Sequence, residues 1–127
     1  MTNRNGVKSN DKMMENAANA LGGSTPELYK AGKWNPMEND GTALKLAVRL
    51  ELDIITPTKD DSMAYCKTKD GSIVTKGLST FTDPFSGVRR AIVMAASKVF
   101  QFQEEKGIKP TFLRDSINNL PVNKKYV

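Results

Sequence analysis

Two adjacent arginines, Arg89 and Arg90, are the side chains of this sequence best suited to hold an anion. They fall in the first turns of a predicted helix, where backbone N–H groups also attract negative charge, so the pattern favours a phosphate ligand. The positive end of the helix dipole disfavours cations at this position. Two arginines there therefore need a compensating anion, which is either a bound ligand or a carboxylate of the chain such as Asp40 or Glu38.

Aromatic side chains supply the second part of a candidate nucleotide site, because a base stacks on an aromatic ring. Trp34 is the only tryptophan, and its alternative role is an apolar plug where the chain enters a helix. The segment 77–87 contains hydroxyl groups and two phenylalanines, which are either core or stacking residues, but it lacks the spacing of a P-loop. The candidate ligand-binding residues are Arg89, Arg90, Trp34, Phe81, Phe85 and Thr82.

Histidine is absent and cysteine occurs once, as Cys66. These counts exclude catalysis by Ser-His-Asp or Cys-His groups, and they exclude ordinary zinc sites. The aspartates Asp53, Asp60 and Asp61 match no magnesium-binding spacing, and the adjacent pair is better explained as part of a solvated loop. We therefore expect a protein that is not an enzyme and that uses neither a metal nor a cofactor. Cys66 lies in the middle of a predicted strand, and we expect it to be a buried apolar residue.

The chain has 127 residues, of which 39% are hydrophobic and 26% charged, so we expect one domain whose core needs no disulfide. Its formal net charge of +5 favours phosphate-bearing partners, although many ordinary domains carry as much charge. The polar start of the chain lacks the apolar stretch of a signal peptide, and no apolar run approaches the ~20 residues of a membrane span. These features predict a cytoplasmic protein without membrane contact.

Apolar periodicity predicts four helices, and the polar segment that precedes them, residues 1–10, is expected to be disordered. The predicted helices run from Asp11 to Leu21, from Ser24 to about Lys30, from Thr42 to about Leu50, and from Pro84 to about Gly107. Their expected caps are Asp11, Ser24, Asn39 or Asp40, and Asp83.

Three β-branched or alternating stretches between the third and fourth helices predict strands. Asp70-Gly71 is the strongest hairpin signal of the chain, and it joins the second strand to the third. The predicted strands are Leu52–Thr56, Ser62–Lys67 and Ser72–Lys76, followed by a loop over 77–82. The resulting α-β-β-β-α core is an α/β (α+β) fold with a three-stranded antiparallel sheet. Two helices can cover one face of such a sheet together or one face each, and both arrangements satisfy burial.

The domain organisation that follows is a disordered N-terminus over 1–10, a single α+β domain over 11–107, and a C-terminal tail over 108–127. Four apolar residues of the tail recur at roughly helical spacing, namely Phe112, Leu113, Ile117 and Leu120. The tail is predicted to include a short helix that docks on its own domain or on a partner.

Two sequence blocks resemble a known family. The run Trp34–Val48, WNPMENDGTALKLAV, is similar to the opening of many small tailed-phage proteins, and Val88–Ala96, VRRAIVMAA, is similar to their closing helix. These proteins form the phage ABA sandwich domain group, which is related to the phage NinX-type proteins. Met37 and Thr42 depart from the commonest residues at their positions. The resemblance covers about Trp34 to Phe102, and it implies one helix on each face of the sheet and a phage accessory role without an assigned activity.

The combined features lead us to expect a non-enzymatic phage accessory binding protein in the host cytoplasm. One form is a counter-defence sponge, a homo-oligomer that buries a host nucleotide or cyclic nucleotide immune signal between its subunits. A direct protein inhibitor of a host factor is an alternative. A nucleic-acid binder like a double-stranded-RNA-binding domain ranks second, because that family's lysine-rich helix start is replaced by Val88–Ile92 and the basic residues are scattered.

Overall fold

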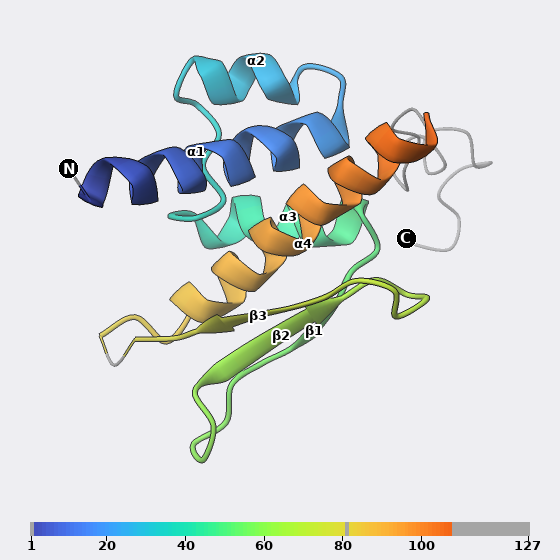
Figure 1. Cartoon of the computed structure of the whole chain (residues 1–127). Helices are drawn as coiled ribbons and strands as arrows, with labels where there is room; N and C mark the ends of the chain where they lie inside the picture. The colour runs from blue at the N-terminus through green and yellow to red at the C-terminus, as the bar shows by residue number, and fades with distance from the viewer. Residues whose placement is uncertain (1, 81, 108–127) are drawn as a thin grey trace, which may run out of the picture.

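The computed structural model describes residues 2–80 and 82–107, with side chains from Asn10 onward. The predictions for Phe81 and for the 108–127 tail fall outside the described residues. In chain order the elements are α1 (Thr2–Leu21), α2 (Thr25–Lys30), α3 (Asp40–Arg49), β1 (Asp53–Ile55), β2 (Met63–Lys67), β3 (Val74–Leu78) and α4 (Ser86–Lys106). The predicted order of elements and the antiparallel sheet are confirmed, and Figure 1 shows their arrangement.

The sheet has β2 at its centre, paired antiparallel with β1 on one side and with β3 on the other. The predicted hairpin is present: Gly71 adopts a left-handed φ of 76°, and the Asp70 carboxylate accepts a hydrogen bond from the backbone N–H of Ser72 at 3.0 Å. The third strand lies further along the chain than predicted, because it extends through Gly77 to Leu78. A glycine that is typical of a loop is here a strand residue that pairs with Ala64.

Helix starts follow the sequence signals in part. Asn39 caps α3, since its side-chain oxygen accepts a hydrogen bond from the N–H of Thr42 at 2.8 Å. Asp83 does not cap α4, which begins later, at Ser86. The first N–H groups of α4 instead find acceptors in the preceding loop, and Gly87 donates to the Ser79 hydroxyl at 3.1 Å.

The first helix begins at Thr2, so most of the segment predicted to be disordered is helical and Asp11 lies inside the helix instead of capping it. Once a helix has nucleated, extending it by one residue changes the free energy little, so its packed C-terminal half can carry a polar first half. That packed half lies against α4, where the Asn16 amide donates to the Ser97 hydroxyl at 3.2 Å. Small residues, among them Ala17 and Ala96, are fully buried in this region and form part of the core.

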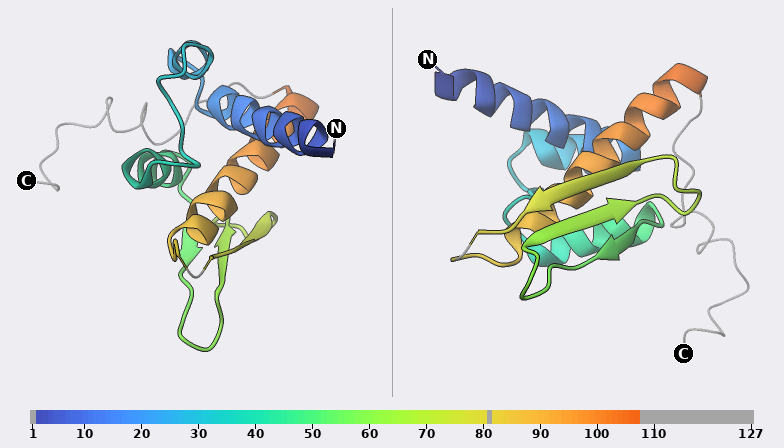
Figure 2. Two further views of the ribbon diagram at one scale, coloured as in Figure 1. Left: turned by 90° about the vertical axis from the view of Figure 1, so that its left-hand side faces the viewer. Right: turned by 60° about the horizontal axis from the view of Figure 1, so that its bottom comes forward.

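All the helices lie on one side of the sheet, as both views of Figure 2 show. The alternating strand residues Ala64, Cys66 and Thr75 are buried toward the helices, whereas Val74 and Leu78 are exposed. Helices α3 and α4 form the layer next to the sheet, and α1 and α2 lie beyond them (Figure 1). The expected sandwich with one helix on each face is therefore corrected to a sheet with helices on one face, whose other face is covered by no residue of the described ranges. The physical reason is that the long α4 buries its apolar stripe against the same face that α3 borders.

Close contact between α4 and β3 fixes how the helix lies on the sheet. The Thr75 hydroxyl donates a hydrogen bond to the carbonyl oxygen of Ala91 in α4 at 2.6 Å. At Gly87 a Cβ atom would lie 2.6 Å from the carbonyl oxygen of Gly77, and at Gly77 a Cβ atom would overlap the carbonyl oxygen of Gly87. Two glycines facing each other thus allow helix and strand backbones to touch.

Cys66 is fully buried on the helix-facing side of β2, and burial raises the pKa of its thiol to about 12. Because only the thiolate is reactive, we expect a disulfide reagent such as Ellman's to label the native protein very slowly at about pH 8 and the urea-unfolded protein within minutes. The native state also holds this proton more tightly than the unfolded state, so the free energy of unfolding should fall as the pH rises above about 9. Rapid labelling of native protein would contradict the buried position.

Candidate ligand-binding site

Arg89, the first candidate for phosphate binding, is buried and already has partners within the chain. Its Nε donates to the carbonyl oxygen of Met37 at 2.7 Å and its Nη1 to the carboxylate of Asp40 at 2.6 Å. Its Nη2 forms an ion pair with Asp83, and that hydrogen bond lowers the pKa of the Asp83 carboxyl. The compensating anion that the helix position requires is therefore a pair of carboxylates, of which Asp40 was expected and Asp83 was not. Arg89 joins the start of α3 to the start of α4.

The other residues of the predicted site are spread over separate surfaces. Arg90 is exposed and points toward α1, where its Nη1 lies 3.4 Å from the side-chain oxygen of Asn10. Phe85 is 59% exposed just before α4, and Thr82 is exposed in the loop before it. None of these residues lines a cavity with Trp34. Trp34 and the two arginines, which were predicted to form one site, therefore lie apart in the structure.

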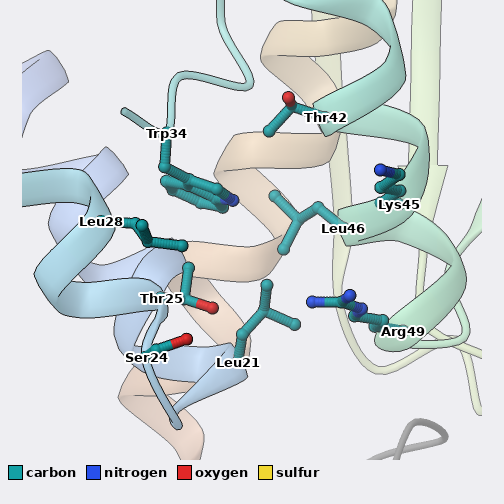
Figure 3. A pocket seen from close by; sticks show the side chains of 9 residues that line it. All are labelled: Leu21, Ser24, Thr25, Leu28, Trp34, Thr42, Lys45, Leu46 and Arg49. Atoms are coloured by element: carbon teal, nitrogen blue, oxygen red, sulfur yellow. The ribbon is translucent and has the colours of Figure 1, made fainter. Parts of the chain in front are cut away.

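Trp34 instead lines a cavity of about 230 Å³ between α1, α2 and α3 (Figure 3). Its indole ring forms one wall, and the leucines Leu21, Leu28 and Leu46 add apolar surface. Polar groups come from two elements. The lining hydroxyl and cationic side chains are those of Ser24 and Thr25 at the start of α2 and of Thr42, Lys45 and Arg49 on α3.

Two cations line this cavity, and no carboxylate in the described part of the chain neutralises them. Neither Lys45 nor Arg49 forms an ion pair with any other described residue. In Figure 3 the guanidinium group of Arg49 extends from α3 across the cavity toward the side of Thr25 and Leu21. An aromatic wall opposite two free cations is suited to a ligand that combines a flat ring with a negative charge.

The hydroxyl of Thr25 adds a directional group to the cavity. Only 7% of the surface of Thr25 is exposed, and its hydroxyl is turned into the cavity, as Figure 3 shows. Its position across the cavity from Arg49 makes it a suitable hydrogen-bond donor for an anionic group bound in the cavity.

The sequence singles out Trp34 as a candidate binding residue but does not single out its cationic neighbours. Thr42, Lys45 and Arg49 recur at intervals of three and four residues, which places them on one face of α3. The same spacing occurs on any solvated helix face, so it did not single out these residues. What makes the face special is α2, which lies across from it and turns a helix surface into the wall of a cavity.

A second cavity of about 270 Å³ lies between α3, β1 and the start of α4, and it is almost entirely apolar. Leu44, Ile54 and Phe85 line it together with the apolar part of Arg89. Within the described part of the chain, no group of three carboxylate, histidine or cysteine side chains is placed to hold a metal ion. A third pocket, of about 360 Å³, is lined by Phe102 together with Glu51, Lys69 and Asp70. Arg89 and Lys69 are held by carboxylates, whereas the cations of the Trp34 cavity have no ion-pair partner among the described residues.

Comparison with known proteins gives no relative from which a role could be transferred. No family model matches the chain, and no curated protein or solved structure is significantly similar to it. The similarity to the phage group stays a prediction from the two sequence blocks. None of the helices in the described ranges has the length and apolar character that crossing a membrane requires.

Proposed function

We propose that this protein is a non-enzymatic binding protein that holds a small nucleotide-like ligand in the Trp34 cavity. The observation that carries the proposal is the convergence of the indole ring with Lys45 and Arg49, two cations that have no described anionic partner. A base would stack on Trp34, and a phosphate would lie between the two cations and accept a hydrogen bond from Thr25.

The volume of the cavity favours a mononucleotide as the portion of a ligand that a single chain binds. About 230 Å³ is smaller than the roughly 300 Å³ at which most small-molecule sites begin, so one base with its sugar and phosphate is the largest unit it suits. A larger signal, such as a cyclic dinucleotide, would need a second subunit to cover its other half. Sequestration of a host nucleotide signal by a phage accessory protein, in a homo-oligomer, is the form of this function that the sequence features favour.

The test uses Trp34 as its own reporter, because it is the only tryptophan. We expect titration with AMP to quench the intrinsic fluorescence and to raise the melting temperature, whereas inorganic phosphate alone should raise the melting temperature only slightly. Replacing Arg49 with glutamine should weaken AMP binding by about tenfold or more, because a hydrogen bond to a charged group contributes roughly 1.5–3 kcal/mol.

The matched control is Arg90→Gln, which removes an arginine from outside the cavity and should leave AMP binding unchanged. Lys45→Gln should weaken binding in the same direction as Arg49→Gln. The proposal is wrong if a panel of mononucleotides, cyclic dinucleotides and ADP-ribose derivatives produces neither a fluorescence change nor a thermal shift. It is also wrong if Arg90→Gln reduces affinity as much as Arg49→Gln.

A further inference from the structure

The face of the sheet turned away from the helices is uncovered by any described residue and is largely apolar (Figure 2, right). An antiparallel sheet with one solvated face ordinarily presents polar side chains on it. Here the exposed fractions are 52% for Ile55, 58% for Val74 and 62% for Leu78. By register, the residues on this open face are Asp53, Ile55, Met63, Tyr65, Lys67, Val74, Lys76 and Leu78.

An aromatic ring occupies the middle of this open face. Tyr65 lies on the central strand, with Ile55 directly opposite on β1 and Lys76 directly opposite on β3. Met63 and Lys67 are the residues before and after Tyr65 on the same face of β2. Side chains opposite one another in a sheet are about 5 Å apart at Cβ, so the ring has apolar neighbours on one side and ammonium groups within reach on the other.

The net charge of the open face is positive. Its single carboxylate, Asp53, is held by Lys69 of the hairpin loop at 2.8 Å, and this hydrogen bond lowers the pKa of the Asp53 carboxyl. Lys67 and Lys76 form no ion pair with a described residue. Both ammonium groups thus remain available to an anionic partner, on a chain whose formal net charge is +5.

We propose that the open face of the sheet binds single-stranded nucleic acid, with a base stacked on Tyr65 and backbone phosphates at Lys67 and Lys76. Flat aromatic bases match the apolar surface around the ring, and the regularly spaced phosphates match the two free cations. A duplex keeps its bases stacked on one another, so it cannot place one on Tyr65. The open face and the Trp34 cavity lie on opposite sides of the α3–α4 layer, and the two sites share no residue.

The experiment measures fluorescence anisotropy of labelled single strands of about 12 nucleotides, oligo-U and oligo-dT, and of a duplex of equal length. We expect both single strands to bind more tightly than the duplex, and the difference between oligo-U and oligo-dT reports whether RNA or DNA is preferred. Tyr65→Leu, which keeps apolar bulk but removes the ring, should weaken binding by about tenfold or more, and Tyr65→Phe should retain it. The double variant Lys67→Gln/Lys76→Gln should reduce the slope of log affinity against log salt by roughly 1.4.

Lys98→Gln is the matched control, because Lys98 is an exposed lysine on α4 outside the open face and should leave affinity unchanged. Circular dichroism of each variant shows that the fold is retained. The proposal is overturned if no strand binds at low salt, if the duplex binds as well as the single strands, or if folded Tyr65→Leu binds like the original protein. Absence of nucleic-acid binding combined with self-association through this face would instead assign it to a second copy of the chain.

Discussion

Replacing Arg89 with methionine is expected to lower the free energy of unfolding by about 2 kcal/mol, measured by urea denaturation. Methionine keeps the apolar stem but removes the donors to Met37, Asp40 and Asp83. Breaking a fully buried ion pair costs more, roughly 3–5 kcal/mol. Here the carboxylates of Asp40 and Asp83 are 63% and 42% exposed, so water hydrates them when the guanidinium is removed.

Arg90→Met is the control for this prediction. The side chain of Arg90 is exposed, so replacing it should change the free energy of unfolding by less than about 0.5 kcal/mol. The effect of pH gives an independent readout. The pKa of Asp83 is lowered in the folded state, so its contribution is present above about pH 4 and is lost as the pH falls below that value. The difference in stability between the original protein and Arg89→Met should therefore shrink in acid. Equal stabilities at neutral pH would show that Arg89 does not join the two helices.

Introducing a single methyl group at Gly77 or Gly87 should destabilise the protein by about 3 kcal/mol, at the upper end of the range for overpacked sites. At either position the new Cβ meets backbone atoms, which cannot rotate away as a side chain can. The helix would have to move off the strand, and the hydrogen bond from Thr75 to Ala91 would lengthen with it. Thermal or urea unfolding of Gly77→Ala and Gly87→Ala measures the loss.

Gly41→Ala in α3 is the matched control for Gly77→Ala and Gly87→Ala. A Cβ at Gly41 meets only the Asn39 side-chain oxygen, at 3.4 Å, and alanine is the better helix former. We expect Gly41→Ala to be neutral or to stabilise by a few tenths of a kcal/mol. If all three alanine variants had the same stability, the backbone contact between α4 and β3 would not determine how the helix is placed.

Some of the features that depend only on neighbouring residues were predictable. Asn39 and the Asp70-Gly71 turn act within a few residues of themselves, and both do in the structure what their types indicate. Whether the second face of the sheet is covered or exposed was not predictable. Ile55, Tyr65 and Leu78 are apolar and alternate with buried residues, a pattern that equally describes strands covered on both faces.

The contacts of the candidate site were also predictable only in part. The helix dipole correctly required an anion for Arg89, and Asp40 was among the expected partners. Asp83 was missed because its position before a helix is typical of a cap, whereas the helix begins later and leaves the carboxylate free to pair. The cations that face Trp34 depend on where α2 packs, and no local pattern of residues encodes that placement.

Helix α1 makes its most extensive contact with α4, so the first described helix depends on the last one. A ribosome releases α1 several seconds before α4, since elongation proceeds at about 5–20 residues per second. During that interval α4 is not yet present to cover the alanine-rich side of α1 or the inner face of the sheet. The contact between α1 and α4 can therefore form only after Lys106 has left the exit tunnel. A chain that stops before α4 would leave that surface open to chaperones and proteases.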